Sequence, residues 1–157
     1  RCVKEPETKV SIMKITSRFT IAIHSMLCIA YYSEEYKVTS TFIASSVNVN
    51  PVIIRRILGK LKKANLIHIK SGSGGSTLAK PTNSISLLDI FHAVTSIDEG
   101  LFNFHTNPCQ ACPIGQNIHR VLDDTLHEFT LLLEQYLSQI MLSQLEDKLH
   151  QSIANYT

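Results

Sequence analysis

Residues 39–79 read TSTFIASSVNVNPVIIRRILGKLKKANLIHIKSGSGGSTLA, and this stretch decides the fold. It predicts a short helix over 41–46, a tight turn over 47–50 and a basic helix over 51–64. An alternating strand, a loop made only of Gly and Ser, and a returning strand follow within 66–79. Pro51 suits the first position of a helix, where its missing N–H costs no hydrogen bond. This order of elements is that of a winged helix-turn-helix.

The helix over 51–64 has an apolar and a basic side. Its inward positions are predicted to be Ile53, Ile54, Ile57, Leu58 and Leu61. Its outward positions are predicted to be Arg55, Arg56, Lys60, Lys62 and Lys63. Gly59 interrupts the helix at a cost of about 1 kcal/mol relative to Ala, which indicates close packing there. A basic helix beside a small, close-approaching loop favours contact with a polyanion over an ordinary solvated face.

The flanking sequence predicts a further set of helices. Thr16 or Ser17 caps a helix that runs to about Tyr32, and Ser86 caps one that runs through Val94. A long helix from Ile114 to about Ile140 and a short one over 142–153 complete the chain. We therefore divide it into a flexible extension (1–12), a winged helix-turn-helix domain (13–94), a cysteine-containing loop (95–113) and dimerisation helices (114–157). The fold class is mostly α with a small β-hairpin wing.

Apolar residues of the long helix recur mostly at steps of three and four, which is typical of a helix that packs against another helix. At 1.5 Å per residue this helix spans about 35–40 Å, more than a small domain covers by itself. The sequence therefore favours a homodimer built on this helix. The alternative is an intramolecular bundle with the first and last helices.

Charge is divided unevenly along the 157 residues. Residues 1–81 have 13 Lys and Arg and 4 Asp and Glu, whereas residues 82–157 have 2 and 9. A net +9 half joined to a net −7 half suits a nucleic-acid-binding module fused to a part that stays off the polyanion, rather than a chance split of surface charge. No apolar run approaches the length of a membrane span, and the polar N-terminus has no signal peptide pattern. We expect a cytoplasmic protein with no membrane partner and with reduced thiols.

Motifs typical of enzymes are missing from the sequence. There is no G-x-S-x-G elbow, dinucleotide fingerprint or H-E-x-x-H pair, and the loop over 71–76 lacks the Lys of a phosphate-binding P-loop. We expect no catalytic residues.

Several motifs in order resemble the Rrf-two (Rrf2) family of bacterial transcription regulators. They are MKITSRF at 13–19, NPVIIRRIL at 50–58, the wing, ISLLDI at 85–90 and CPIGQNI at 112–118. The resemblance covers the chain from Met13 to its end. It implies a dimeric winged helix-turn-helix repressor that binds a palindromic, double-stranded DNA operator. Some members of the family hold an iron–sulfur cluster on three cysteines of the loop, and others sense oxidants or small ligands.

The cysteines depart from the cluster-bearing pattern. The loop offers only Cys109 and Cys112, and even with His105 it has three ligands at most, so we expect no metal and no iron–sulfur cluster. A C-x-x-C pair in a reducing compartment is more often redox-active or metal-binding than structural. Cys112 near a helix start would favour the thiolate. We expect redox sensing through Cys109 and Cys112, with Cys28 as a further candidate across the dimer or else a small buried apolar residue.

In a dimer that presents two 51–64 helices to the duplex, side chains divide into two classes of DNA contact. Those at the turn and the start of the helix are predicted to meet base edges: Asn48, Asn50, Pro51, Val52 and Arg55. Others are predicted to hold phosphates or reach the minor groove: Thr16, Arg18, Arg56, Lys60, Ser73 and Gly74. Two other functions stay open, a regulator with a ligand pocket between the dimer helix and the DNA-binding body, and a helical adaptor that does not bind DNA.

Overall fold

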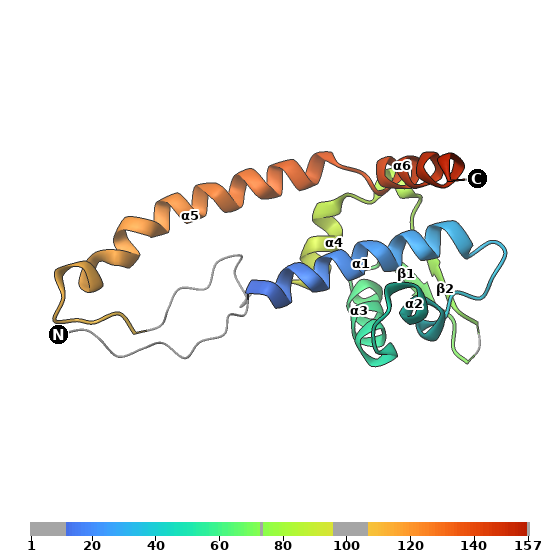
Figure 1. Ribbon diagram of the computed structural model, residues 1–157, viewed down its shortest axis with the longest axis horizontal. Helices are drawn as coiled ribbons and strands as arrows, with labels where there is room; N and C mark the ends of the chain where they lie inside the picture. Colours follow the sequence, from blue (N-terminus) through green and yellow to red (C-terminus); the bar gives the residue numbers. More distant parts are fainter. Residues whose placement is uncertain (1–11, 73, 96–106, 157) are drawn as a thin grey trace.

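A computed structural model describes residues 12–72, 74–95 and 107–156 and shows a mainly helical chain with one β-hairpin (Figure 1). The elements are α1 (Ile12–Tyr32), α2 (Ser40–Val47), α3 (Pro51–Lys63), β1 (Ile67–Ile69), β2 (Ser76–Leu78), a 3-10 turn η1 (Thr82–Ser84), α4 (Leu87–Val94), α5 (Pro113–Gln139) and α6 (Leu142–Asn155). The predicted fold class is confirmed.

Helix α1 begins earlier than predicted. It starts at Ile12, so Thr16 and Ser17 lie inside the helix and do not cap it. Residues 12–15 contain no Gly or Pro to stop the helix, which accounts for its extension. The flexible extension predicted over 1–12 lies, except for Ile12, outside the described residues.

The core lies where α1 crosses the helix-turn-helix and α4. The largest apolar side chains that are less than 2% exposed come from α1, α2, α3, β1, α4, α6 and the segments between them: Met26, Ile29, Val38, Ile43, Ile54, Leu61, Ile67, Ile85, Ile90, Val94 and Leu142. Burying each contributes roughly 1.5–3 kcal/mol relative to leaving it in water. Because α1, α3 and α4 share this core, the orientation of α3 is fixed by the body of the protein.

The wing is a two-stranded antiparallel hairpin in which Ile67 pairs with Leu78 and Ile69 with Ser76. β1 is shorter than the predicted 66–70, and β2 lies one residue before the predicted 77–79. The Ser76 N–H donates to the Val38 carbonyl at 2.8 Å, which ties β2 to the segment before α2. The hairpin is therefore held beside the helix-turn-helix.

Helix α4 begins with a capping box, in which Asp89 N donates to Ser86 Oγ at 3.1 Å and Ser86 N donates to Asp89 Oδ2 at 2.8 Å. This confirms Ser86 as its cap. Leu87 N donates to Ile140 O and Leu142 N to Ile85 O, each at 2.8 Å, so the junction of α5 and α6 is bonded to the start of α4. The C-terminal end of α5 is thereby anchored to the body.

Helix α5 extends from the body as an arm, with its first turns at the far end of the molecule (Figure 1). Its last third contacts the body through Leu137, which is buried, and through His92 of α4, whose Nε2 lies 3.1 Å from Glu134 Oε1. Among the described residues, no helix has both the length and the apolar character that crossing a bilayer requires.

Candidate nucleic-acid interface

The turn between α2 and α3 is built by short polar side chains. Thr39 Oγ1 accepts from Phe42 N at 3.2 Å and caps α2. Asn48 closes that helix in the left-handed region, with φ 60°. Asn50 Oδ1 accepts from Val52 N at 2.9 Å and caps α3, with Pro51 at the first helical position as predicted. These local bonds fix the direction in which α3 leaves the turn.

Helix α3 buries Ile54, Ile57, Leu58 and Leu61, as predicted, but not Ile53. Ile53 is 41% exposed and Val52 is 44% exposed, so the start of the helix presents apolar as well as polar groups to solvent. The prediction that Ile53 faces inward was wrong, because at 100° per residue Ile53 lies beyond the edge of the arc that the four buried side chains share.

The prediction for Gly59 was also wrong. A Cβ at Gly59 would meet no atom within 4 Å. The residue is exposed, so the glycine leaves the helix weaker without admitting a close neighbour.

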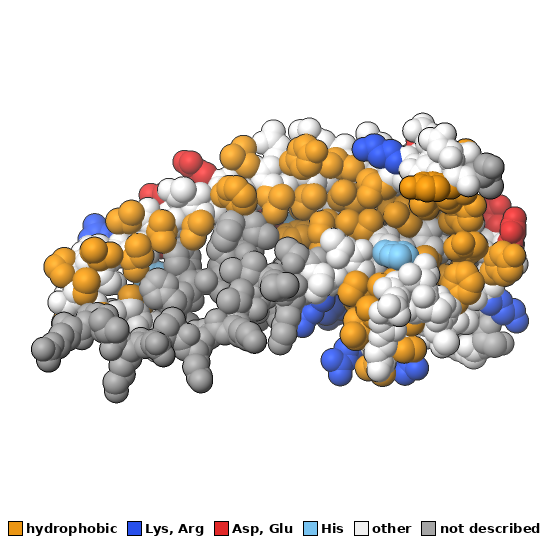
Figure 2. Space-filling model, in the orientation of Figure 1, with side chains coloured by type: hydrophobic (Ala, Val, Ile, Leu, Met, Phe, Trp, Pro, Cys, Tyr) orange, Lys and Arg blue, Asp and Glu red, His pale blue; other side chains and the backbone are white. Residues whose placement is uncertain are grey.

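Cationic side chains gather around α3. Arg55 and Arg56 are exposed, and neither forms an ion pair within the described part of the chain. Figure 2 shows Lys and Arg side chains along the edge of the body that α3 forms, at the bottom of the view. In the same view, Asp and Glu side chains lie on α5 and at the end of the body that is opposite the start of α5. The charge asymmetry of the sequence is therefore also an asymmetry in space.

Lys60 departs from its predicted role. Its Nζ donates to the Val94 carbonyl at 3.0 Å, so the side chain lies against α4 instead of pointing outward. With Arg18 and Arg56 it lines a recess of about 380 Å³ between α1 and α3, floored by Ile21 and Ile57. The structure thus brings three of the predicted phosphate contacts together. Thr16 also lies on α1, and its side chain is outside the described residues.

A second recess, of about 180 Å³, separates α3 from the wing. Arg55 lines it from α3, Thr39 and Ser40 from the start of α2, and Lys70 and Gly72 from the wing. Ser40 and Lys70 are not among the residues that the sequence predicts to contact DNA. The signal for them was the start of α2, where unpaired N–H groups favour an anion, next to a wing that begins with a cation.

Glycine is required in the wing at Gly75. Its φ is +75°, and a Cβ there would lie 2.9 Å from Val38 N. Lys70 N donates to Gly75 O at 3.1 Å, which closes the loop. Gly74 is half-buried against the Lys70 side chain, and Ser73 is outside the described residues.

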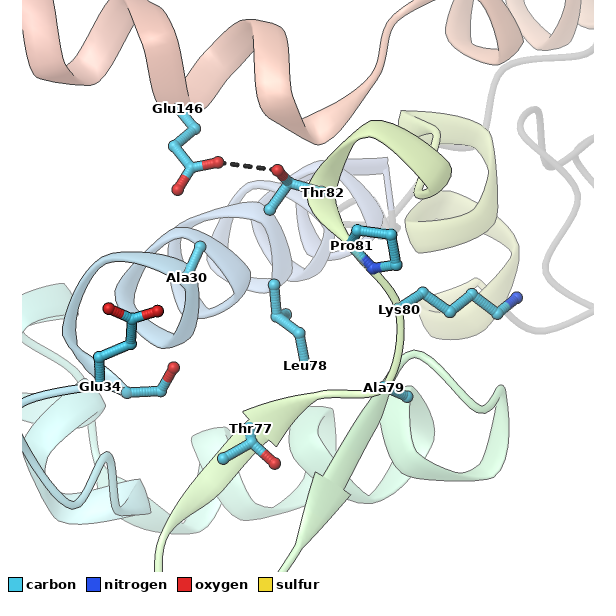
Figure 3. A pocket seen from close by; sticks show the side chains of 10 residues that line it. Ala30, Glu34, Thr77, Leu78, Ala79, Lys80, Pro81, Thr82 and Glu146 are labelled. Carbon is cyan, nitrogen blue, oxygen red and sulfur yellow. Dashed lines mark hydrogen bonds between the residues drawn. The ribbon is translucent and has the colours of Figure 1, made fainter.

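The opposite side of the hairpin is unsuited to DNA. A hollow of about 530 Å³ lies between β2, α1 and α6. Figure 3 shows Glu34 and Glu146 on two sides of this hollow, and the Lys80 amino group points away from both. Glu146 Oε2 accepts from Thr82 Oγ1 at 2.8 Å. Two carboxylates here would repel a phosphate backbone, so this side of the hairpin suits DNA less well than the side that faces α3.

The loop cysteines form a tight turn at the start of α5. Cys112 N donates to Cys109 O at 3.2 Å, and Cys112 is the cap residue of the helix. Gln116 Nε2 donates to Gln110 O, and a Cβ at Gly115 would collide with the Cys109 carbonyl oxygen. The turn therefore lies directly on the first turn of α5. Cys109 is exposed, and Cys112 is a half-buried free thiol.

Cys28 lies in a different part of the molecule. It is 5% exposed in α1, and its Sγ donates to Ser46 Oγ at 3.6 Å. Burial raises the pKa of the Cys28 thiol, an effect that the bond to Ser46 partly opposes. Figure 1 places the start of α5 at the other end of the molecule from α2, so within one chain Cys28 is no neighbour of the loop pair.

The donor atoms do not suit an iron–sulfur cluster. Clusters are bound by three or four thiolates, and the segment between α4 and α5 contains two cysteines. Within the described ranges, no three His, Cys, Asp or Glu side chains group as metal ligands would. His105 lies outside those ranges.

Comparison with known proteins gives concordant results. A family model described as Rrf2, iron-dependent transcriptional regulator, matches residues 15–148. YwnA of Bacillus subtilis, a candidate HTH-type transcriptional regulator, is 40% identical over 124 residues, which are 79% of this chain and 90% of YwnA.

Two solved structures agree along most of the chain. One, described as a candidate DNA-binding protein, has a TM-score of 0.64 and 34% identity, and the match covers 82% of this chain and 97% of the other. A candidate transcriptional regulator from Lactobacillus plantarum has a TM-score of 0.69 and 27% identity, covering 85% and 89%.

Proposed function

The chain belongs to the Rrf2 family of DNA-binding transcriptional regulators, and we propose on this basis that it is a homodimeric repressor of a palindromic operator, controlled by its loop thiols. It is a regulator and not an enzyme, as expected. The family also favours DNA binding over the role of a helical adaptor. The observation that carries the proposal is the exposed basic start of α3 lying beside the wing.

Base edges are read by the first turn of α3. Val52 and Arg55 are exposed there, and Asn48, Asn50 and Pro51 form the approach to it. Arg pairs bidentately with guanine, and a short amide pairs with adenine. Asn50 uses its Oδ1 as the helix cap, so it reads a base through its Nδ2 donor. Discrimination between operators therefore depends on Arg55 more than on Asn50.

Phosphates bind in the two recesses on either side of α3. Arg18 and Arg56 face one, and Lys70 and Ser40 face the other. Gly74 of the wing brings backbone close to the duplex. Lys60 contributes charge to the first recess, although its bond to Val94 keeps it from direct contact with phosphate.

Dimerisation is supported by one apolar stripe on α5. Ile114, Val121, Phe129, Leu132 and Tyr136 are each more than half exposed. At 100° per residue they fall within one side of the helix. Exposed apolar side chains of this extent mark an interaction surface, and a second α5 crossing the first would cover them.

A twofold-symmetric dimer requires an operator with two symmetry-related half-sites, which is a palindromic sequence. The dimer sets two α3 helices into successive major grooves, about 34 Å apart, and each reads one half-site. A dimer that occupies a promoter in this way excludes the polymerase, and repression follows.

Redox control acts through the turn at 109–112. The ends of such a turn lie within about 7 Å, which is close to the Cα separation of a disulfide. Oxidation by hypochlorous acid removes two electrons and two protons from the thiols, forms the Cys109–Cys112 bond and yields chloride, water and one proton released to solvent. Because the turn lies on the first turn of α5, the new bond strains the dimer arm and changes the spacing of the two α3 helices. A bond from either thiol to Cys28 of the partner subunit would act on the same arm.

The regulator works without an iron–sulfur cluster. Its donor set lacks the third thiolate, whereas the description of the family model mentions iron. Anaerobically purified protein should show no visible absorbance. A brown sample whose colour depends on Cys109 would overturn this part of the proposal.

The decisive experiment is a DNA-binding assay with the region upstream of the protein's own gene. We expect salt-dependent binding by the reduced protein and release on hypochlorite treatment. Cys109→Ser and Cys112→Ser should bind when reduced and resist release. Cys28→Ser, measured in parallel, separates the loop pair from a bond between subunits.

Each outcome assigns the failure to one part of the proposal. Lack of binding under reducing conditions would refute the choice of operator and the DNA-facing surface. Binding that oxidant leaves unchanged would refute only the thiol control.

A further inference from the structure

A pocket of about 280 Å³ lies between α1, α2 and α6, and it shares no lining residue with the two recesses beside α3. Its lining residues are His24, Leu27, Cys28, Tyr31, Tyr32, Ser46, Leu149 and Ile153. Those from α1 fall mainly on one side of that helix at steps of three and four, and Leu149 and Ile153 form one side of α6. Three helices thus enclose one cavity.

The pocket has a polar end. Ser46 Oγ lies 2.9 Å from His24 Nε2 and accepts from Cys28 Sγ at 3.6 Å. This hydroxyl is the only hydrogen-bond link among these three side chains, so it connects α2 to two successive turns of α1. A ligand that forms a hydrogen bond to His24 or Ser46 would replace the hydrogen bond between these two side chains.

The remainder of the pocket is apolar and aromatic. Tyr31 and Tyr32 pack edge to face with ring centroids 4.7 Å apart, and His150 of α6 packs on Tyr31 at 5.3 Å. Leu27, Leu149 and Ile153 supply aliphatic surface. No Lys, Arg, Asp or Glu lines the cavity, so a charged ligand would lose its hydration without gaining a partner.

These properties define the ligand. We propose that this pocket binds a compact, neutral aromatic molecule with one hydrogen-bonding group, such as a phenol or an indole, whose polar group bonds to His24 and Ser46. Since a water molecule occupies about 30 Å³ in the liquid, the volume suits roughly ten non-hydrogen atoms. The rings of Tyr31 and Tyr32 favour an aromatic ligand over an aliphatic one through edge-to-face packing.

The position of Ser46 gives the pocket a route to DNA binding. Ser46 lies in the last turn of α2, directly before Val47–Asn50, the turn that orients α3. A ligand that replaces the hydrogen bonds of Ser46 to His24 and Cys28 changes how α2 packs on α1, and α3 shifts with α2. This regulatory step rests on the proposed function, whereas binding of the ligand does not.

Binding is tested without DNA. The chain has no Trp, so added indole can be excited selectively beyond the tyrosine absorption and its emission followed as protein is titrated in. We expect saturable binding of indole and its displacement by phenol. Benzoate, which is charged, should not displace it.

Matched variants on α2 locate the site. Ser46→Leu places an apolar side chain in the cavity and should weaken indole binding at least ten-fold. Ser45→Leu makes the same change one residue earlier, where Ser45 Oγ bonds to Phe42 O outside the pocket, and should bind as the wild type does. His24→Gln should weaken binding on the order of five-fold, the effect of one neutral hydrogen bond.

Several results would overturn the proposal. They are non-saturable binding of indole, equal binding by Ser46→Leu and the wild type, or equal loss in Ser45→Leu. Thermal unfolding of each variant checks that it is folded. If Ser46→Leu instead dissociates the dimer in sedimentation, the face is a subunit contact and no ligand pocket. Adding indole to a functioning DNA-binding assay then tests the coupling, which is refuted if DNA affinity does not change.

Discussion

At the scale of single residues, the start of α3 combines structural and recognition roles in one side chain. Asn50 caps the helix through Oδ1, and its Nδ2 faces the duplex in our proposal. Asn50→Ala should cost about 1 kcal/mol of unfolding free energy, the usual value of a cap. Asn50→Ser keeps an oxygen acceptor, so it should retain stability and lose only discrimination. Thermal unfolding, together with affinities for operator and scrambled DNA, separates the two. Equal discrimination by Asn50→Ser and the wild type would remove Asn50 from the reading surface.

Arg56 provides charge without reading sequence. It lines the recess with Arg18 and has no ion pair within the described ranges. Arg56→Ala should weaken binding to operator and scrambled DNA alike and lower the slope of log K against log salt by about 1. Arg120→Ala, which removes the same charge from α5, should leave the slope unchanged. A loss confined to the operator would instead make Arg56 a base contact.

At the scale of elements, one substitution should have opposite effects in two helices. Gly59→Ala in α3 meets no atom within 4 Å and should raise the unfolding free energy by about 1 kcal/mol. Gly115→Ala in α5 drives a Cβ into the Cys109 carbonyl and should destabilise the turn that holds the two thiols. Denaturant unfolding measures the first effect. The second is measured by the rate of disulfide formation between Cys109 and Cys112, which should change in Gly115→Ala and not in Gly59→Ala.

At the scale of the whole molecule, α5 decides the assembly. Leu132 lies within the apolar stripe and is 65% exposed, whereas Leu131 is 51% exposed on another side of the helix. Leu132→Asp should yield monomers in sedimentation and abolish operator binding, because one α3 alone cannot span two half-sites. Leu131→Asp introduces the same charge next to it and should leave the dimer intact. Dissociation by both variants, or by neither, would contradict the proposed interface.

The sequence by itself determined the order of the elements and the cap of α4, whereas α1 begins before the cap predicted at Thr16 or Ser17. Ser86 caps α4 as predicted, and Thr39 and Asn50 cap α2 and α3 in the same way, because each cap depends on a side chain and a backbone N–H two or three residues away. The two faces of α3 followed from its period except at its first turn. The apolar stripe on α5 was also predicted, because helical periodicity is a local property of the sequence.

Only the tertiary structure decided what depends on neighbours distant in the chain. It turned Lys60 against the Val94 carbonyl, left Gly59 without a neighbour and exposed Ile53. It also set His24, Cys28 and Ser46 around one cavity, and separated Cys28 from Cys109 and Cys112. Helical periodicity specifies which side of a helix is apolar, but the side chain that meets it is set by how the helices pack. That packing depends on the shared core of α1, α3 and α4, which no local pattern specifies.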